Sequence, residues 1–304
     1  MPDLALPFFD FLLPALVALG VLLFAWRRRE GPASEGPDRG APRTTSGTAS
    51  SARALGAVAF GAALLAAWWS VFGEFAVPSA SRVLAAKDWI PWSIVAAIAT
   101  AGLARFERAR RIVPSGGAPL VLSLLVLLAM RTRISAGGSG ILHALLVFLV
   151  AMATWTALEL SSERLRGPLP SLVLALAAAG SAVALALSGD TALGRLCGSL
   201  SAVSVASAFV ARQRRVFTLS GGPVAIVSVV LIGSWTSTWI SQTTPLSSIV
   251  LLWAAVAVPS AAGIGPLSTW PATRREIARV ALTLALALAG VWIAFQARPG
   301  THGY

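Results

Sequence analysis

Long apolar runs separated by short polar segments form the pattern along this chain. Ten runs are each about as long as a helix needs to cross roughly 30 Å of hydrocarbon. They predict an all-α, polytopic transmembrane helical bundle of about ten spans. The expected spans are residues 4–26, 54–77, 89–104, 118–130, 141–160, 169–187, 192–211, 224–240, 246–264 and 280–297.

The first polar segment divides the chain into three parts. Residues 1–26 predict an N-terminal transmembrane anchor, because three arginines follow the apolar run rather than precede it, the reverse of a signal peptide. Residues 27–53 are rich in Gly, Pro, Ser and Thr and lack apolar periodicity, which predicts a flexible cytoplasmic linker. Residues 54–304 then form a multi-helix transmembrane domain.

Composition supports this class. With 56% hydrophobic and 12% charged residues and a mean hydropathy of +0.78, the chain is too apolar for a soluble domain of 304 residues. A single cysteine, Cys197, excludes an intramolecular disulfide, and two histidines are too few for a typical imidazole metal site. We therefore expect neither a metal nor a cofactor. The preference for Arg over Lys is typical of a GC-rich bacterial genome.

Basic residues indicate the orientation of the spans. If the N-terminus lies outside, 18 of the 24 Lys and Arg fall in the inner loops. This asymmetry follows the positive-inside rule and predicts a bacterial inner-membrane protein with both termini outside. The net charge of +12 is then a topology signal that faces anionic lipid on the inner side, and it does not indicate nucleic-acid binding.

Two inner loops resemble each other. Both contain Arg-x-Arg-Arg, a short spacer and Ser-Gly-Gly before an apolar run. The residues are Arg108, Arg110, Arg111, Ser115, Gly116 and Gly117 in the first copy, and Arg212, Arg214, Arg215, Ser220, Gly221 and Gly222 in the second. Their offset covers four helices, which predicts a parallel four-helix repeat in which helices 3–6 correspond to helices 7–10.

The same loops have the groups to hold an anion or a lipid headgroup. Arginines would stand beside converging backbone N–H groups at a helix N-terminus. The alternative is that the arginines anchor the inner boundary while Ser-Gly-Gly-Pro turns the chain into the next helix. We favour this second interpretation.

Ionisable residues at membrane depth are a second set of candidates. They are Asp10, Glu74, His143, Asp190 and Arg195, and all fall in the outer halves of their predicted spans. None lies at the centre of a span, which argues against a proton or sodium relay. Snorkelling to the interface and a pairing of Asp190 with Arg195 are the favoured explanation.

Small residues recur along the run 192–211. Gly194, Gly198, Ala202 and Ala206 are spaced by four residues, which predicts close helix packing rather than a polar lining.

Residues 234–244 combine hydroxyl side chains with two tryptophans at a predicted outer boundary. This composition suits the binding of a lipid or a sugar. An interfacial aromatic belt at a loop entry explains it equally well.

Enzymatic motifs are missing from the sequence: it has no P-loop, no Gly-x-Ser-x-Gly and no His-rich metal spacing. We expect an integral inner-membrane protein with a structural or partner-binding role, a subunit of a larger complex with protein partners in the membrane. The alternative is a transporter or channel-like permease for a small neutral or anionic solute, and an intramembrane lipid-modifying enzyme is third. A water-accessible cavity lined by Asp10, Glu74 or His143 would favour transport.

Overall fold

The computed structural model describes residues 14–18, 20, 46–76, 85–103, 117–135, 137–164, 167–213, 222–261 and 270–297. These ranges are almost entirely helical and contain no strand, which confirms the all-α class. The α-helices are α2 (Ser46–Phe72), α3 (Trp89–Leu103), α5 (Gly117–Ile134), α6 (Gly138–Arg164), α7 (Leu169–Leu187), α8 (Thr191–Gln213), α9 (Gly222–Ile240), α10 (Leu246–Ala261) and α11 (Ala272–Gln296). A 3-10 turn, η1 (Ala86–Asp88), precedes α3.

Each of these helices overlaps one of the apolar runs from residue 54 onward, but α2 ends at Phe72 rather than at residue 77, and α11 begins at Ala272 rather than at residue 280. Six of them, α2, α6, α7, α8, α9 and α11, are long and apolar enough to cross a membrane. The apolar part of α10, Leu246–Val258, is shorter, and α3 has 15 residues. The described helices therefore indicate a multi-pass membrane protein, whereas a count of ten spans is not confirmed.

The N-terminal region is described only in part. Residues 14–18 are helical within the predicted anchor, and α2 begins at Ser46, inside the segment predicted to be a linker. Residues 27–45 lie outside the described ranges.

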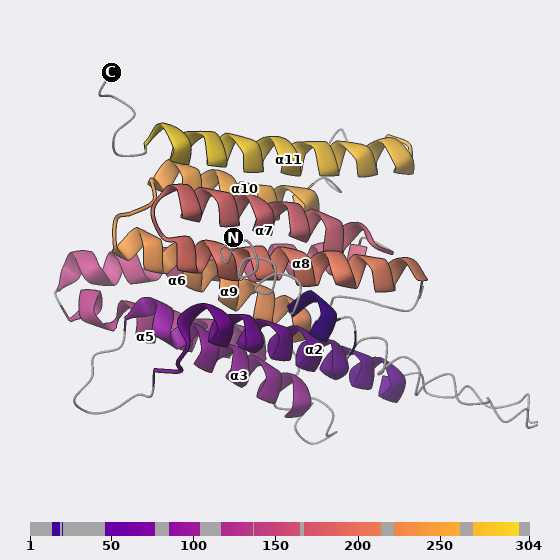
Figure 1. The fold of residues 1–304 in the computed structure, drawn as a ribbon, viewed down its shortest axis with the longest axis horizontal. Coiled ribbons are helices and arrows are strands. Elements are labelled where there is room, and N and C mark those ends of the chain that lie inside the picture. The colour runs from indigo at the N-terminus through magenta and orange to yellow at the C-terminus, as the bar shows by residue number, and fades with distance from the viewer. Residues whose placement is uncertain are drawn as a thin grey trace, which may run out of the picture.

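Helices that follow one another in the chain run in opposite directions along the bundle (Figure 1). Consequently α5, α7, α9 and α11 end, and α6, α8 and α10 begin, at the left of Figure 1. We call this the Trp239 end, because Trp239 lies in the last turn of α9. α6, α8 and α10 end, and α7, α9 and α11 begin, at the opposite end.

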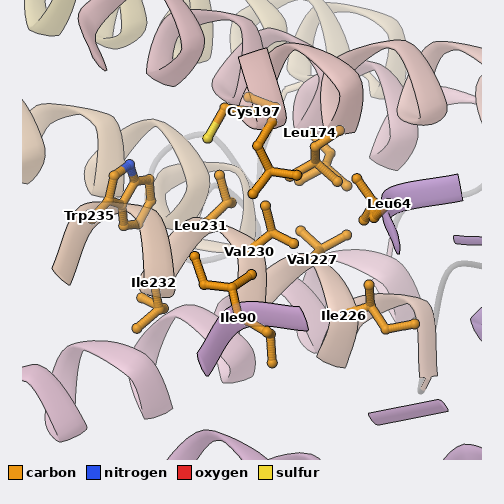
Figure 2. Close-up of a cluster of buried hydrophobic side chains, with 14 of the residues drawn as sticks. Leu64, Ile90, Leu174, Cys197, Ile226, Val227, Val230, Leu231, Ile232 and Trp235 are labelled. Atoms are coloured by element: carbon orange, nitrogen blue, oxygen red, sulfur yellow. The ribbon is translucent and has the colours of Figure 1, made fainter. Parts of the chain in front are cut away.

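α9 lies at the centre of the bundle, where it contacts α2, α3, α5, α6 and α8. Of its apolar window 83% is buried, against 33% for α6 and 28% for α11. A helix that is apolar on all sides is expected in such a central place. Figure 2 shows Val230 and Leu231 of α9 within a cluster that also contains Leu64, Ile90 and Leu174 from three other helices.

Glycines allow several of these helices to approach closely. A Cβ atom on Gly233 of α9 would lie 2.6 Å from Ile90 of α3, and one on Gly180 of α7 would lie 2.8 Å from Ala287 of α11. Hydroxyl groups connect neighbouring backbones: Ser248 of α10 donates to the Gly290 carbonyl of α11 at 2.8 Å. Small residues and polar contacts of this kind replace the hydrophobic driving force that helices lack in lipid.

The packing pairs do not confirm the predicted parallel repeat. α5 packs against α6, whereas the corresponding helices α9 and α10 make no extensive contact in their described parts. Conversely, α10 packs against α11, while the described parts of α6 and α7 do not pack together. Similar loops thus lead into helices with different neighbours.

Candidate functional site: a polar cavity at the Trp239 end

The two similar loops lie largely outside the described ranges. This holds for Arg108, Arg110, Arg111, Ser115, Gly116, Arg214, Arg215, Ser220 and Gly221. Gly117 and Gly222 are the first residues of α5 and α9, so both copies end at the entry to a helix. Arg212 is exposed in the last turn of α8. Whether these loops bind an anion stays a prediction.

The ionisable candidates lie at helix ends where they are described, and Asp10 lies outside the described residues. Asp190 caps α8 by accepting a hydrogen bond from the Leu193 N–H at 3.1 Å. Glu74 is exposed just beyond α2, and its backbone carbonyl accepts a 3.2 Å hydrogen bond from the Trp68 indole. Arg195 is half-buried near the start of α8.

Small residues of α8 face α7, as expected for close packing. A Cβ atom on Gly194 would lie 2.8 Å from the carbonyl oxygen of Ala182 in α7. The Ser201 hydroxyl donates to the Ala175 carbonyl of α7 at 2.8 Å, whereas that of Ser204 donates within α8. Gly198, Ala202 and Ala206 are half-buried along the same helix.

His143 opens onto a cavity of about 450 Å³ at the Trp239 end. The end of α5, the start of α6, the turn from α9 to α10 and the end of α11 surround it. Its lining residues are Met130, Arg133, His143, Trp239, Ile240, Gln242, Thr243, Thr244, Pro245, Leu246 and Ala297. The cavity therefore joins His143 to the segment 234–244, two candidates that are about a hundred residues apart in the sequence.

The turn after α9 has a Schellman arrangement. The Thr243 N–H donates to the Thr238 carbonyl at 3.1 Å, and the Gln242 N–H donates to the Trp239 carbonyl at 3.2 Å. Gln242 occupies the left-handed position with φ 57°, where glycine is preferred. A strained residue that places its side chain at a cavity is a reason to suspect a functional constraint.

Arg133 is held at the cavity by the end of α9. Its guanidinium donates to the Ile240 carbonyl at 3.1 Å, a favourable place for a cation because the last carbonyls of a helix carry partial negative charge. A guanidinium has five N–H donors. Within the described residues this bond is the single one that it makes, so donors are left to face the cavity.

Thr244 is 4% exposed, and among the described residues its hydroxyl has no hydrogen bond. An unpaired buried hydroxyl costs about 1–3 kcal/mol. His143 also lines the cavity, and its ring lies edge-on to the Trp239 ring, with centroids 5.2 Å apart.

The described residues that line the cavity carry positive charge and no negative charge. None of its lining residues is Asp or Glu, while Arg133 is always protonated. The site is thus suited to an anion or a neutral polar group and unsuited to a cation. Among the described residues, no group of three or more His, Cys, Asp or Glu side chains is placed to hold a metal ion.

A second, apolar hollow of about 100 Å³ adjoins the cavity and shares Trp239 and Leu246 with it. It lies between α9 and α10 against α6, and Thr236 is the only one of its lining residues with a hydroxyl. Trp253 of α10 also lines it, and in the described part of the protein the indole N–H of this residue is buried without a partner.

The helices α6, α9 and α10, which line the hollow, lie closer together at the opposite end of the bundle. There, α6, α9 and α10, together with the start of α7, leave a void of only about 20 Å³ beside Ser161, Val227 and Val256. That is room for about one water molecule. Among the described residues, α9 and α10 thus border a larger space at the Trp239 end than at the other.

Arg133 was not among the residues that the sequence singled out. One signal was present: Arg131 and Arg133 are two of only six basic residues on the predicted outer side. Their departure from the positive-inside pattern marks this helix end as unusual. The contact of Arg133 with Ile240 spans 107 residues, so spacing along the chain gives no sign of it.

Comparison with protein-family models, with curated proteins and with solved structures found no match to this chain.

Proposed function

We propose that this protein is a permease-type membrane protein that takes up a small anionic or neutral polar solute at its Trp239 end. The observation that carries the proposal is the cavity of about 450 Å³, which falls within the 300–1,000 Å³ usual for ligand sites. The cavity is lined by His143, the feature that we expected to distinguish transport from a structural role.

An anion is the solute that the polar groups favour. Arg133 supplies a fixed positive charge, and the bond to Ile240 orients its guanidinium before any ligand arrives. The His143 ring also lines the cavity. Preorganised donors cost less entropy on binding than flexible ones do.

The void between α6, α9 and α10 at the opposite end is about 20 Å³, against about 450 Å³ for the cavity, and this asymmetry suits one state of a transport cycle. Movement of α10 relative to α9, two helices without extensive contact in their described parts, would connect the two ends.

The orientation is part of the proposal. The division of 18 basic residues against six supports an inner-membrane protein of a bacterium with both termini outside, with anionic lipid at the inner face. The Trp239 end would then face outward. A reporter fused to the C-terminus, active only outside the cytoplasm, tests this, and activity of a cytoplasmic reporter there would contradict it.

A subunit role in a larger complex is the second candidate. α11 is the least buried of the six long helices and exposes Leu288 and Trp292. Lipid tails cover such a surface as well as a protein partner does, so this surface supports the subunit role less than the cavity supports the permease.

Substitutions of two arginines in α5, Arg133 and Arg131, test whether the cavity binds an anion. We expect ethyl phosphate to bind the purified full chain in phosphatidylcholine nanodiscs, and Arg133→Gln to weaken binding at least tenfold by removing charged hydrogen bonds. Arg131→Gln is the matched control, because Arg131 is exposed two residues away and does not line the cavity. The proposal fails if both variants bind alike or if no binding is measurable by calorimetry.

A further inference from the structure

We infer that the solute is an amphiphile whose anionic headgroup occupies the polar cavity and whose single apolar tail lies in the hollow between α9 and α10. This inference rests on the proposed function, and it names the class of solute.

The polar cavity and the apolar hollow adjoin each other. Trp239 and Leu246 line both, so the two spaces meet at these side chains. The polarity changes at this boundary: Arg133, His143 and Thr244 lie on one side, and aliphatic and indole side chains lie on the other. A ligand that fills both spaces must itself change from polar to apolar along its length.

The hollow is open toward the hydrocarbon. α9 and α10 make no extensive contact where they are described, and α6 closes the space behind them. Leu146 and Val250 at its edges are each 50% exposed. In a membrane, exposed apolar side chains of this kind face lipid tails, so a tail has a lateral entry that a water-soluble solute does not need.

The length of the hollow suits part of an alkyl chain. Leu246 and Trp253, which line it, are seven residues apart on α10, or about 10 Å along the helix at 1.5 Å per residue. A purely polar solute would leave this space to the tails of bilayer lipids, because the hollow is open toward the hydrocarbon.

The headgroup chemistry is that of a phosphate or a carboxylate. Both accept the paired N–H groups of a guanidinium such as that of Arg133. An alkyl phosphate and a fatty acid are therefore the two sources that the experiment separates.

Photolabelling locates the tail. The full chain in phosphatidylcholine nanodiscs is irradiated with dodecyl phosphate that carries a diazirine at the tail end, and labelled residues are mapped by mass spectrometry. We expect the label on α9 and α10 around Val250 and Trp253. Arg133→Gln should lower this labelling at least tenfold, because the head no longer anchors the tail, and Arg131→Gln should change it less than twofold.

A second variant separates the tail from the head. Val250→Trp fills the hollow at a position that is 50% exposed, and Val205→Trp is its control on α8, at 52% exposed. We expect Val250→Trp to lower labelling of the hollow at least fivefold while ethyl phosphate affinity stays within twofold of the unmodified protein. Val205→Trp should change neither quantity.

The outcomes distinguish the two proposals. Label spread evenly over the lipid-facing helices and unchanged by Arg133→Gln overturns the amphiphile while leaving ethyl phosphate binding intact. Absence of ethyl phosphate binding overturns the proposed function itself. Competition by unlabelled dodecyl phosphate or by dodecanoate supports the inference and identifies the headgroup, and competition by neither of them overturns it.

Discussion

α9 is packed tightly on one side and loosely on the other. Toward α3, a Cβ atom on Gly233 would lie 2.6 Å from Ile90, and toward α2, Pro223 lies 3.0 Å from the Cβ position of Gly56. Toward α10, the same helix borders the apolar hollow and the small void at its opposite end. α9 thus has one closely packed face, toward α2 and α3, and one face that borders open space, toward α10.

α9 is loosely packed toward α10 because α10 packs closely against α11. Gly290 of α11 lets Leu252 of α10 approach to 3.1 Å of its Cβ position, and Ser248 donates to the Gly290 carbonyl. α10 therefore packs against α11 and α6 rather than against α9. Tryptophans fill part of the resulting gap, and the remainder is the proposed site. Packing at one helix contact thus creates the space at another.

The largest effect is expected on the tight side. Gly233→Leu places a branched side chain against Ile90, which is fully buried, and we expect the free energy of unfolding to fall by about 3 kcal/mol. Gly102→Leu in α3 is the control, because nothing lies within 4 Å of the Cβ position of Gly102. Denaturant titration in detergent measures both. Equal stability of the two variants would show that the α3 contact yields easily.

An intermediate effect is expected in the cavity. Thr244→Val removes a buried hydroxyl that has no partner among the described residues, so the free energy of unfolding should rise by about 1 kcal/mol. Thr238→Val is the matched variant, since the Thr238 hydroxyl donates to the Ser234 carbonyl at 3.1 Å. That change should lower stability by about 1 kcal/mol. Denaturant titration measures both, and a loss of stability in Thr244→Val would show that its hydroxyl has a partner.

The smallest effect is expected at the tryptophans of the hollow. Trp253→Phe removes an indole N–H that has no partner among the described residues, so stability should change by less than about 0.5 kcal/mol. Trp235→Phe removes an indole that donates to the Ser181 hydroxyl at 3.3 Å, and it should cost about 1 kcal/mol. Thermal unfolding of the two variants compares them. A larger loss for Trp253→Phe would mean that this indole supports the fold.

Helix positions were readable from the chain because long apolar runs and the turns between them are local features. α7 begins and ends where the run 169–187 does, and α9 differs from its run only by two residues at its start. α2 begins earlier, at Ser46, because the last part of the predicted linker contains Ala and Ser that a helix accepts.

The site was less predictable because its parts come together through packing. His143 and residues 234–244 were both candidates, but their proximity depends on how α6 lies against α9. Arg133 reaches Ile240 only because α5 also packs there. Gln242 occupies a backbone conformation that sequence preferences assign to glycine. The two similar loops, by contrast, can be recognised in the sequence because each is a local motif. They do not predict which helices pack together, because that depends on the faces of neighbouring helices.

The contact between α7 and α11 has a consequence for biosynthesis. Gly180 lies against Ala287, so the surface of α7 that bears this glycine is complementary to a helix that is synthesised later, after α8, α9 and α10. Domains fold as the chain is made, with earlier parts emerging first. A nascent chain stalled before residue 272 would therefore leave this face of α7 without its helix partner.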